Sequence, residues 1–187
     1  MTRIHFEYAI LGALIERPMH GYDLYKSLSV DLGRLVYVGM SNMYAILKQL
    51  ESEGHVASTP DTGGNRPPKK IFSVTDKGRR LFMDWISTPV ESIRDMRVDF
   101  LTKLYFLKKL DIPGGRELVT RQKGVCHRIL ESIGSPETRE SEFAGLLFDF
   151  RRSQIESILS WLDRCLGFVE AGTGENRARR THEDVQT

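Results

Sequence analysis

The chain has 187 residues, of which 40% are hydrophobic and 28% are charged, as is typical of a soluble globular protein of one or two domains. Its net charge is only +2, so binding to nucleic acid would have to rest on the local placement of basic residues. No apolar run approaches the ~18 residues of a membrane span, and no signal-peptide core or CxxC pair is present. We therefore expect a cytoplasmic protein that has no membrane contact, metal or cofactor.

Three short helices are predicted within the first fifty or so residues. Residues 6–15 are apolar at helical spacing, and Pro18 ends this helix because a residue before proline is pushed out of the α region. A second helix opens at residues 20–23 and stops at Gly33. Before the third helix, residues 36–38 (Val-Tyr-Val) predict a short strand.

The third helix begins at Ser41, whose hydroxyl is expected to cap its first turn, and ends at Gly54. Met43, Leu47 and Leu50 form its buried stripe. The opposite face carries Asn42, Tyr44, Ala45, Lys48 and Gln49. This face contains no acid, and its groups suit base edges and phosphates in a major groove, although a merely solvated face would have a similar composition.

A basic β-hairpin is predicted after these helices. Residues 56–59 and 71–75 are β-prone, residues 61–65 are turn-forming, and residues 67–68 (Pro-Pro) stiffen the return arm. No acid occurs between residues 62 and 75, and the basic residues of this segment are Arg66, Lys69 and Lys70. Three helices followed by a basic hairpin is the order of a winged helix-turn-helix, whose third helix enters the major groove.

Several motifs within residues 6–80 resemble those of the PadR family of bacterial transcriptional regulators. They are Leu-Gly-Ala-Leu at 11–14, Pro-Met-His-Gly-Tyr-Asp-Leu at 18–24, Ser-Asn-Met-Tyr at 41–44, Leu-Lys-Gln-Leu-Glu at 47–51, Arg-Pro-Pro-Lys-Lys-Ile-Phe at 66–72 and Val-Thr-Asp-Lys-Gly at 74–78. The sequence departs from the family pattern at Ala45, where proline is frequent, and at Ser41-Asn42, where Gly-Thr is frequent. The resemblance implies a homodimeric regulator, often ligand-responsive, with a helical second domain that dimerises.

The second half is predicted to be helical throughout. Helices are expected over residues 75–87, 98–107 and 118–133, and a proline-free helix of about 50 Å over residues 137–169. One stripe of this long helix is Phe143, Leu147, Phe150, Ile158 and Leu162, and the other is Ala144, Phe148, Ile155, Leu159 and Leu166. Two stripes need two partners, so we expect the second to be another copy of the chain. An intramolecular three-helix bundle is the alternative.

The fold class is therefore predicted to be mainly α with a small β-hairpin. Residues 1–90 form a winged helix-turn-helix DNA-binding domain, and residues 91–169 form a helical dimerisation domain with a possible effector-sensing role. Residues 170–187 are rich in Gly, Thr and charged residues, which predicts a disordered tail. Arginines in this tail would be either solvated or in contact with DNA.

The candidate DNA contacts on the third helix have stated alternatives. Asn42 and Gln49 can read adenine, or contact a phosphate, or be solvated. Lys48 suits a phosphate, with a solvated lysine as the alternative. The hydroxyl of Tyr44 either contacts a phosphate or its ring packs flat on the first helix. Ser41 and Ala45 lie on or beside the same face.

On the hairpin, Lys69 and Lys70 alternate along a strand, so only one of them is expected to face DNA. Arg66, near the tip, is the candidate for reaching a groove. The candidates for lining an effector pocket are Trp85, Phe148, Phe150 and Trp161, with simple core packing as the alternative.

The predicted function is a sequence-specific, DNA-binding transcriptional regulator. We expect a homodimeric repressor on an inverted-repeat operator, with release by a small-molecule effector as a further expectation. Two other functions stay open, namely a winged-helix protein-interaction module and a ligand-binding protein or helical enzyme with no DNA role. No catalytic motif such as a P-loop, GxSxG or HExxH is present, so no enzymatic activity is expected.

Overall fold

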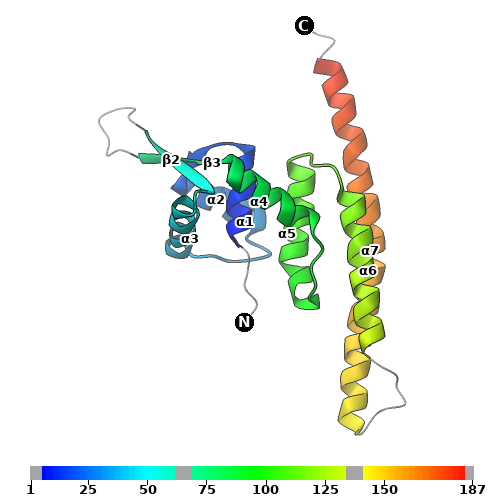
Figure 1. Ribbon diagram of the computed structural model, residues 1–187. Coiled ribbons are helices and arrows are strands. Elements are labelled where there is room, and N and C mark those ends of the chain that lie inside the picture. The colour runs from blue at the N-terminus through cyan, green and yellow to red at the C-terminus, as the bar shows by residue number, and fades with distance from the viewer. Residues whose placement is uncertain (1–5, 62–68, 134–140, 184–187) are drawn as a thin grey trace. The chain divides into compact units, whose positions relative to one another are not determined.

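The computed structural model describes residues 6–61, 69–133 and 141–183, with side chains up to residue 169. The chain divides into two compact units. Unit 1 comprises the chain up to residue 88 together with residues 97–106, and unit 2 comprises residues 89–96 and the chain from residue 107 onward. Each unit is described by itself (Figure 1).

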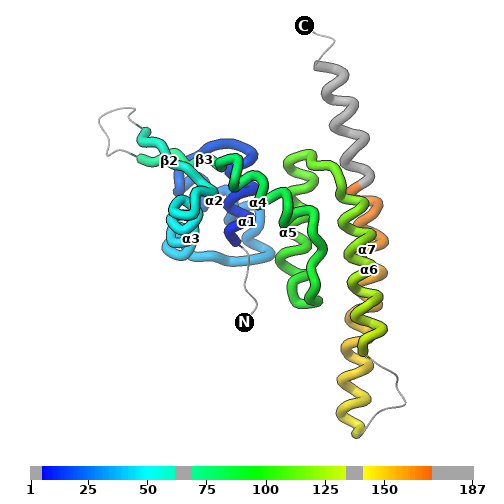
Figure 2. Tube along the Cα trace, viewed as in Figure 1, coloured from blue at the N-terminus to red at the C-terminus, as the bar shows by residue number. Residues whose placement is uncertain are grey.

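Unit 1 contains the helices α1 (Phe6–Glu16), α2 (Gly21–Leu32), α3 (Met40–Ser52) and α4 (Asp76–Ser87), together with α5 (Asp99–Lys109) as far as Phe106. Its sheet consists of β1 (Met19–His20), β2 (Val56–Asp61) and β3 (Lys69–Val74), in the antiparallel order β1-β3-β2. We call the hairpin of β2 and β3 the wing. Figure 2 shows the chain passing from the end of α3 directly into β2, so the wing starts beside α3. The fold is the predicted one, mainly helical with a winged helix-turn-helix arrangement.

The core of unit 1 is built around α1. Apolar residues occur on all sides of this helix, so the helix is stable only when other elements surround it. Buried side chains from the surrounding helices include Leu24, Leu28, Leu32, Met43, Leu47, Leu50, Phe82 and Ile86. A Cβ atom on Gly12 would lie 2.7 Å from the ring of Phe106, so this glycine allows α5 to approach α1 closely.

The junction between α3, β3 and α4 was largely predicted. Gly54 has a φ of 75°, the left-handed conformation expected at the end of the third helix. Thr75 caps α4, because its hydroxyl accepts a hydrogen bond from the backbone nitrogen of Gly78 at 3.1 Å. The same hydroxyl donates to the carbonyl of Gly54 at 2.8 Å, which ties the end of α3 to the start of α4.

Two local predictions were wrong. Ser41 does not cap α3, because the helix begins at Met40 with Gly39 as its N-cap, and the backbone nitrogen of Met43 donates to the Gly39 carbonyl at 3.0 Å. Residues 36–38 form no strand. The Val36 backbone nitrogen bonds to the Leu32 carbonyl at 3.0 Å, and the two-residue strand β1 occupies the edge of β3 opposite β2.

Unit 2 contains most of the 3₁₀ turn η1 (Ile93–Arg97), the end of α5, α6 (Gly115–Ser132) and α7 (Glu142–Glu183). The helices α6 and α7 lie side by side (Figure 1). Buried side chains on these two helices include Leu118, Val119, Val125, Cys126, Ile155, Leu162 and Cys165. The buried amide of Gln122 accepts from the backbone nitrogen of Val90 at 2.8 Å and donates to its carbonyl at 2.9 Å, which holds the connector against α6.

The helix α7 extends further than the predicted long helix at its C-terminal end, whereas residues 137–140 of the predicted helix lie outside the described residues. It begins at Glu142 and continues to Glu183, so residue 170 is not a helix end and residues 170–183 are helical rather than disordered. No proline interrupts this segment, its residues 175–180 are rich in good helix formers, and extending an existing helix adds one hydrogen bond for each residue fixed. Residues 184–187 of the predicted tail lie outside the described residues. Within the described part of the chain, no helix has the length and apolar character needed to cross a membrane.

Candidate nucleic-acid interface

The outward face of α3 has the composition that the sequence predicted. The side chains of Ser41, Asn42, Tyr44, Ala45, Lys48 and Gln49 are all exposed, whereas Met43, Leu47 and Leu50 are buried on the opposite side. The Gln49 amide donates to the Glu53 carboxylate at 2.8 Å, an interaction within the same helix that the sequence reading missed. This bond directs the Gln49 side chain toward the end of α3.

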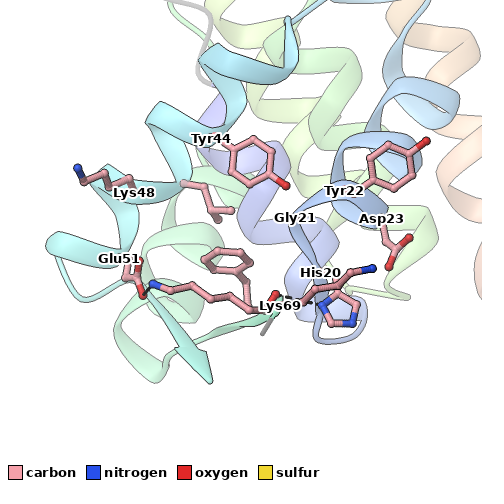
Figure 3. A pocket seen from close by; sticks show the side chains of 11 residues that line it. His20, Gly21, Tyr22, Asp23, Tyr44, Lys48, Glu51 and Lys69 are labelled. Atoms are coloured by element: carbon pink, nitrogen blue, oxygen red, sulfur yellow. Dashed lines mark hydrogen bonds and ion pairs between the residues drawn. The ribbon is translucent and has the colours of Figure 1, made fainter. Parts of the chain in front are cut away.

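Tyr44 lies over the start of α2. A Cβ atom on Gly21 would come within 2.6 Å of both the Tyr44 hydroxyl oxygen and its ring, so only glycine leaves room for this ring. The tyrosine is 40% exposed, and Figure 3 shows its hydroxyl directed toward Gly21. The ring therefore packs on α2 rather than on the first helix, and the residue as a whole stays partly exposed.

A hollow of about 610 Å³ lies between the start of α2, the outward face of α3 and strand β3 (Figure 3). Leu47 and Phe72 are nearly or fully buried and form its apolar floor. The polar side chains that line it include His20, Asp23, Lys48, Glu51, Lys69 and Lys70. The hollow thus combines a phenol, an apolar floor and several charges on one side of unit 1.

The two lysines of the wing differ in their contacts. The ammonium of Lys70 lies 3.5 Å from the Glu51 carboxylate on α3. Within the part of the chain that the structure describes, Lys69 has no ion-pair partner and is exposed. The sequence led us to expect that only one of these lysines faces DNA. The difference in their contacts favours Lys69 as that residue.

Glu51 connects α3 to both strands of the wing. Its carboxylate accepts a hydrogen bond from the Ser58 hydroxyl on β2 and faces Lys70 on β3. The Ser58 bond, followed by the charge of Lys70, lowers the pKa of Glu51 despite the opposing effect of desolvation. Glu51 is therefore anionic at neutral pH and holds the wing against α3.

His20 forms a second connection to the wing, from β1. Its Nδ1 lies 3.1 Å from the Lys70 carbonyl oxygen, and its Nε2 lies 3.3 Å from the Asp61 carboxylate. The side chain makes no capping bond to α2, although His20 occupies the N-cap position. Sequence reasoning assigned His20 to the start of the second helix and missed the contact with the wing, whose residues lie about forty to fifty positions further along the chain.

Some candidates fall elsewhere. Arg66 lies outside the described residues. Trp85 is buried in unit 1, where its ring stacks on Tyr8 at a centroid distance of 4.5 Å and lies 4.9 Å from the Lys103 ammonium. The other effector candidates, Phe148, Phe150 and Trp161, lie on α7 in unit 2. Trp85 thus has the packing of a core residue, and the effector pocket stays a prediction.

The structure offers little that suits a metal or a nucleophile. Among the described residues, no cluster of three or more His, Cys, Asp or Glu side chains could hold a metal ion. Cys126 and Cys165 are buried free thiols. Burial raises the pKa of both, that of Cys165 to about 11, so both are protonated at neutral pH and poor nucleophiles.

Known proteins share this sequence pattern. Residues 10–84, which include α2, α3 and the wing, match the model of the Transcriptional regulator PadR-like family. The chain is 25% identical over 179 residues to the Negative transcriptional regulator PadR of Bacillus subtilis, an alignment that covers 88% of this chain and 97% of that protein.

Two solved structures of Bacillus subtilis PadR are also similar to this chain at 25% identity. The complex with operator DNA has a TM-score of 0.44 and covers 90% of this chain and 99% of its own. The complex with p-coumaric acid has a TM-score of 0.39 and covers 88% of this chain and 98% of its own. Residues 10–84 thus carry the sequence pattern of the PadR-like family of transcriptional regulators, and nearly the whole length of the chain is similar to the Bacillus regulator.

Proposed function

We propose that the protein is a homodimeric repressor that binds an inverted-repeat operator, and that it has no enzymatic role. The observation that carries this proposal is the outward face of α3, where Ser41, Asn42, Tyr44, Ala45, Lys48 and Gln49 are exposed, together with the exposed Lys69 on the wing. These are the groups that contact base edges and phosphates when a helix enters a major groove. The name of the Bacillus subtilis relative, a negative regulator, supports repression as the direction of control.

In this proposal, residues 1–90 bind DNA and residues 91–169 dimerise. Asn42 reads base edges, with Ser41, Ala45 and Gln49 beside it, and Lys48 contacts the phosphate backbone together with Tyr44. Lys69 contacts the backbone from the wing, whereas Lys70 holds the wing in place. Arg66 is proposed to reach a flanking groove. Because the net charge of the protein is small, its affinity for DNA would come from this local arrangement of basic and polar side chains. Each phosphate contact would release counterions, so the affinity would depend strongly on salt.

The apolar face of α7 supports dimerisation. Four large apolar side chains at helical spacing are exposed on it, namely Phe143 (72%), Leu146 (65%), Leu147 (47%) and Phe150 (63%). Contiguous exposed apolar residues of this size mark an interaction surface. A second copy presents the same stripe, so a two-fold interface would cover both. In such a dimer the two α3 helices would read half-sites about one turn of DNA, roughly 34 Å, apart.

We include a small-molecule effector in the proposal. The Bacillus subtilis relative has been crystallised with p-coumaric acid, which makes a phenolic acid the first class of compound to try. On α7, the aromatic residues Phe148, Phe150 and Trp161 are the candidates for contacting such a ligand. Release of DNA on addition of p-coumaric acid would support this part of the proposal, and unchanged binding would remove this compound from it.

The test is a selection of bound fragments from random duplex DNA, followed by a salt titration on the selected sequence. We expect an inverted repeat with one-turn spacing and a steep loss of affinity with salt, at a slope of about −0.9 for each phosphate neutralised. If no duplex is enriched at low salt by the ligand-free dimer, the proposed repressor function is wrong. In that case a pull-down with a charge-matched control would test the protein-interaction alternative.

A further inference from the structure

Lys70 is held from two sides. Its ammonium faces Glu51 on α3 at 3.5 Å, and its backbone carbonyl faces the imidazole of His20 on β1 at 3.1 Å. The first contact ties β3 to α3 and the second ties it to β1, in addition to the backbone pairing of β3 with β1 and β2. Because Lys69 is the next residue along the same strand, the placement of its ammonium depends on both contacts.

Both ring nitrogens of His20 face an oxygen atom of the wing. Nδ1 faces a backbone carbonyl, and Nε2 faces the Asp61 carboxylate at 3.3 Å. Both partners are hydrogen-bond acceptors. A neutral imidazole carries one N–H and can donate to only one of them, whereas an imidazolium donates to both and also carries a charge opposite to that of Asp61.

We propose that His20 is a positioning residue for DNA binding, whose protonated ring clamps β3 and β2 to β1 and so sets the position of the wing. A neutral ring keeps only one of these two contacts as a donor, so the wing is held less firmly and duplex affinity falls when the ring loses its charge. The DNA part of this inference rests on the proposed function. The clamp itself is a property of the free protein.

Asp61 from β2 contacts the ring, and the other charged side chains that line the same hollow are Asp23 from α2, Lys48 and Glu51 from α3, and Lys69 and Lys70 from β3. Carboxylates ordinarily titrate near pH 4 and ammonium groups near pH 10, so imidazole is the group type here whose charge changes between about pH 6 and 8. The clamp is complete when the ring is charged and is weakened when the ring is neutral.

The first experiment is a double-mutant cycle on the free protein with His20→Gln and Asp61→Asn. The glutamine amide can still donate to the Lys70 carbonyl, and asparagine preserves the shape of Asp61, so both variants are expected to fold. At pH 6, each single change should lower the folding equilibrium constant by about two- to fivefold, and the double variant no more than the larger single one. At pH 8, the coupling should vanish. Coupling that is equal at both pH values, or absent at both, overturns the clamp.

The second experiment measures duplex affinity at pH 6 and pH 8 and fixed ionic strength. The wild type should lose about two- to fivefold more affinity than His20→Gln over this range, and Asp61→Asn should flatten the profile as well. His127→Gln is the matched control, because His127 is exposed in unit 2, and it should keep the wild-type profile. A His20→Gln profile that equals the wild-type one overturns the proposal.

The two experiments separate the two possible failures. If the protein binds no duplex at either pH, the proposed repressor function is wrong, and the cycle on the free protein still decides whether the ring holds the wing. If duplex binds and the pH profile does not depend on His20, the repressor proposal stands and the positioning role of His20 is rejected.

Discussion

The outward face of α3 and the exposed stripe of α7 are both solvent-facing sides of amphipathic helices, but their chemistry is opposite. The face of α3 carries two amides, a phenol and an ammonium, whereas the stripe of α7 carries Phe143, Leu146, Leu147 and Phe150. Polar groups are well hydrated in water and lose that hydration when they bind. Covering exposed apolar area instead gains about 25 cal/mol of free energy for each Å² that is removed from water.

This difference predicts how permanent each proposed contact is. The stripe of α7 should be covered by a second copy at all times, since the uncovered state is unfavourable in any buffer. The face of α3 should bind and release DNA reversibly, with an affinity that is set by counterion release. Raising the salt concentration should therefore weaken DNA binding while leaving the dimer intact, and the predictions below test each side of this contrast.

The largest effect is expected on α7, from Leu146→Glu combined with Phe150→Glu. A two-fold interface would place four new carboxylates where four large apolar groups were covered, so the dimer dissociation constant should rise by about a hundredfold or more. Sedimentation measures this directly. Operator affinity should fall with it, because each half-site would be held by a single subunit.

The control for this prediction is Ser160→Glu, an exposed position further along α7. It should leave the dimer unchanged. If the double variant still sediments as a tight dimer, the apolar stripe is not the interface, and the division of roles between α3 and α7 must be redrawn.

The next largest effect is expected at Gly21. An alanine Cβ there would lie 2.6 Å from the Tyr44 hydroxyl and ring, so the tyrosine must leave its seat. We expect Gly21→Ala to weaken binding to all duplexes by about tenfold, because the displaced ring would no longer place its hydroxyl for a backbone phosphate. In a Tyr44→Ala background the same change should have little further effect.

Gly39→Ala provides the matched control, since a Cβ at Gly39 meets nothing within 4 Å and its φ of −65° suits any residue. It should keep wild-type affinity to within about twofold. Equal losses of duplex affinity for Gly21→Ala and Gly39→Ala would mean that the affinity depends on the start of α3 and not on the packing of Tyr44 over Gly21.

The contrast between the two faces also shows what sequence can reveal. The stripe of Met43, Leu47 and Leu50 recurs at helical spacing, so the outward face of α3 followed from the sequence without knowledge of tertiary contacts. The long helix followed from the same periodicity. Its true ends did not, because fraying and extension at helix termini depend on small differences in free energy.

The contacts that hold the wing could not have been predicted in the same way. His20 and Lys70 are fifty positions apart, and the strand β1 that brings them together has only two residues, too few to show alternation. Glu51 was counted as part of a helix motif, and its bonds to Ser58 and Lys70 depend on the angle at which the wing leaves α3. Long-range polar contacts of this kind have no sequence period.

The wing lysines give a prediction of intermediate size. Lys69→Ala should weaken all duplexes by about three- to fivefold at moderate salt and reduce the salt slope by about one phosphate, because its ammonium has no acidic partner among the described residues. Lys70→Ala should leave the salt slope unchanged, since its charge is already paired with Glu51. A loss of slope in Lys70→Ala, with none in Lys69→Ala, would reverse the assignment.

The smallest effect is expected from Tyr44→Phe, which removes one hydroxyl and keeps the ring in its seat over Gly21. If the hydroxyl contacts a phosphate, affinity should fall by about two- to fivefold, equally for operator and random duplex, as for the loss of one ordinary hydrogen bond. The dimer should be unaffected.

Comparison with Gly21→Ala then separates the effect of the hydroxyl from the effect of the ring. A full loss in Tyr44→Phe would mean that the hydroxyl alone carries the contact. No loss at all would leave the ring as a spacer between α2 and α3, and the phosphate would then be held by Lys48.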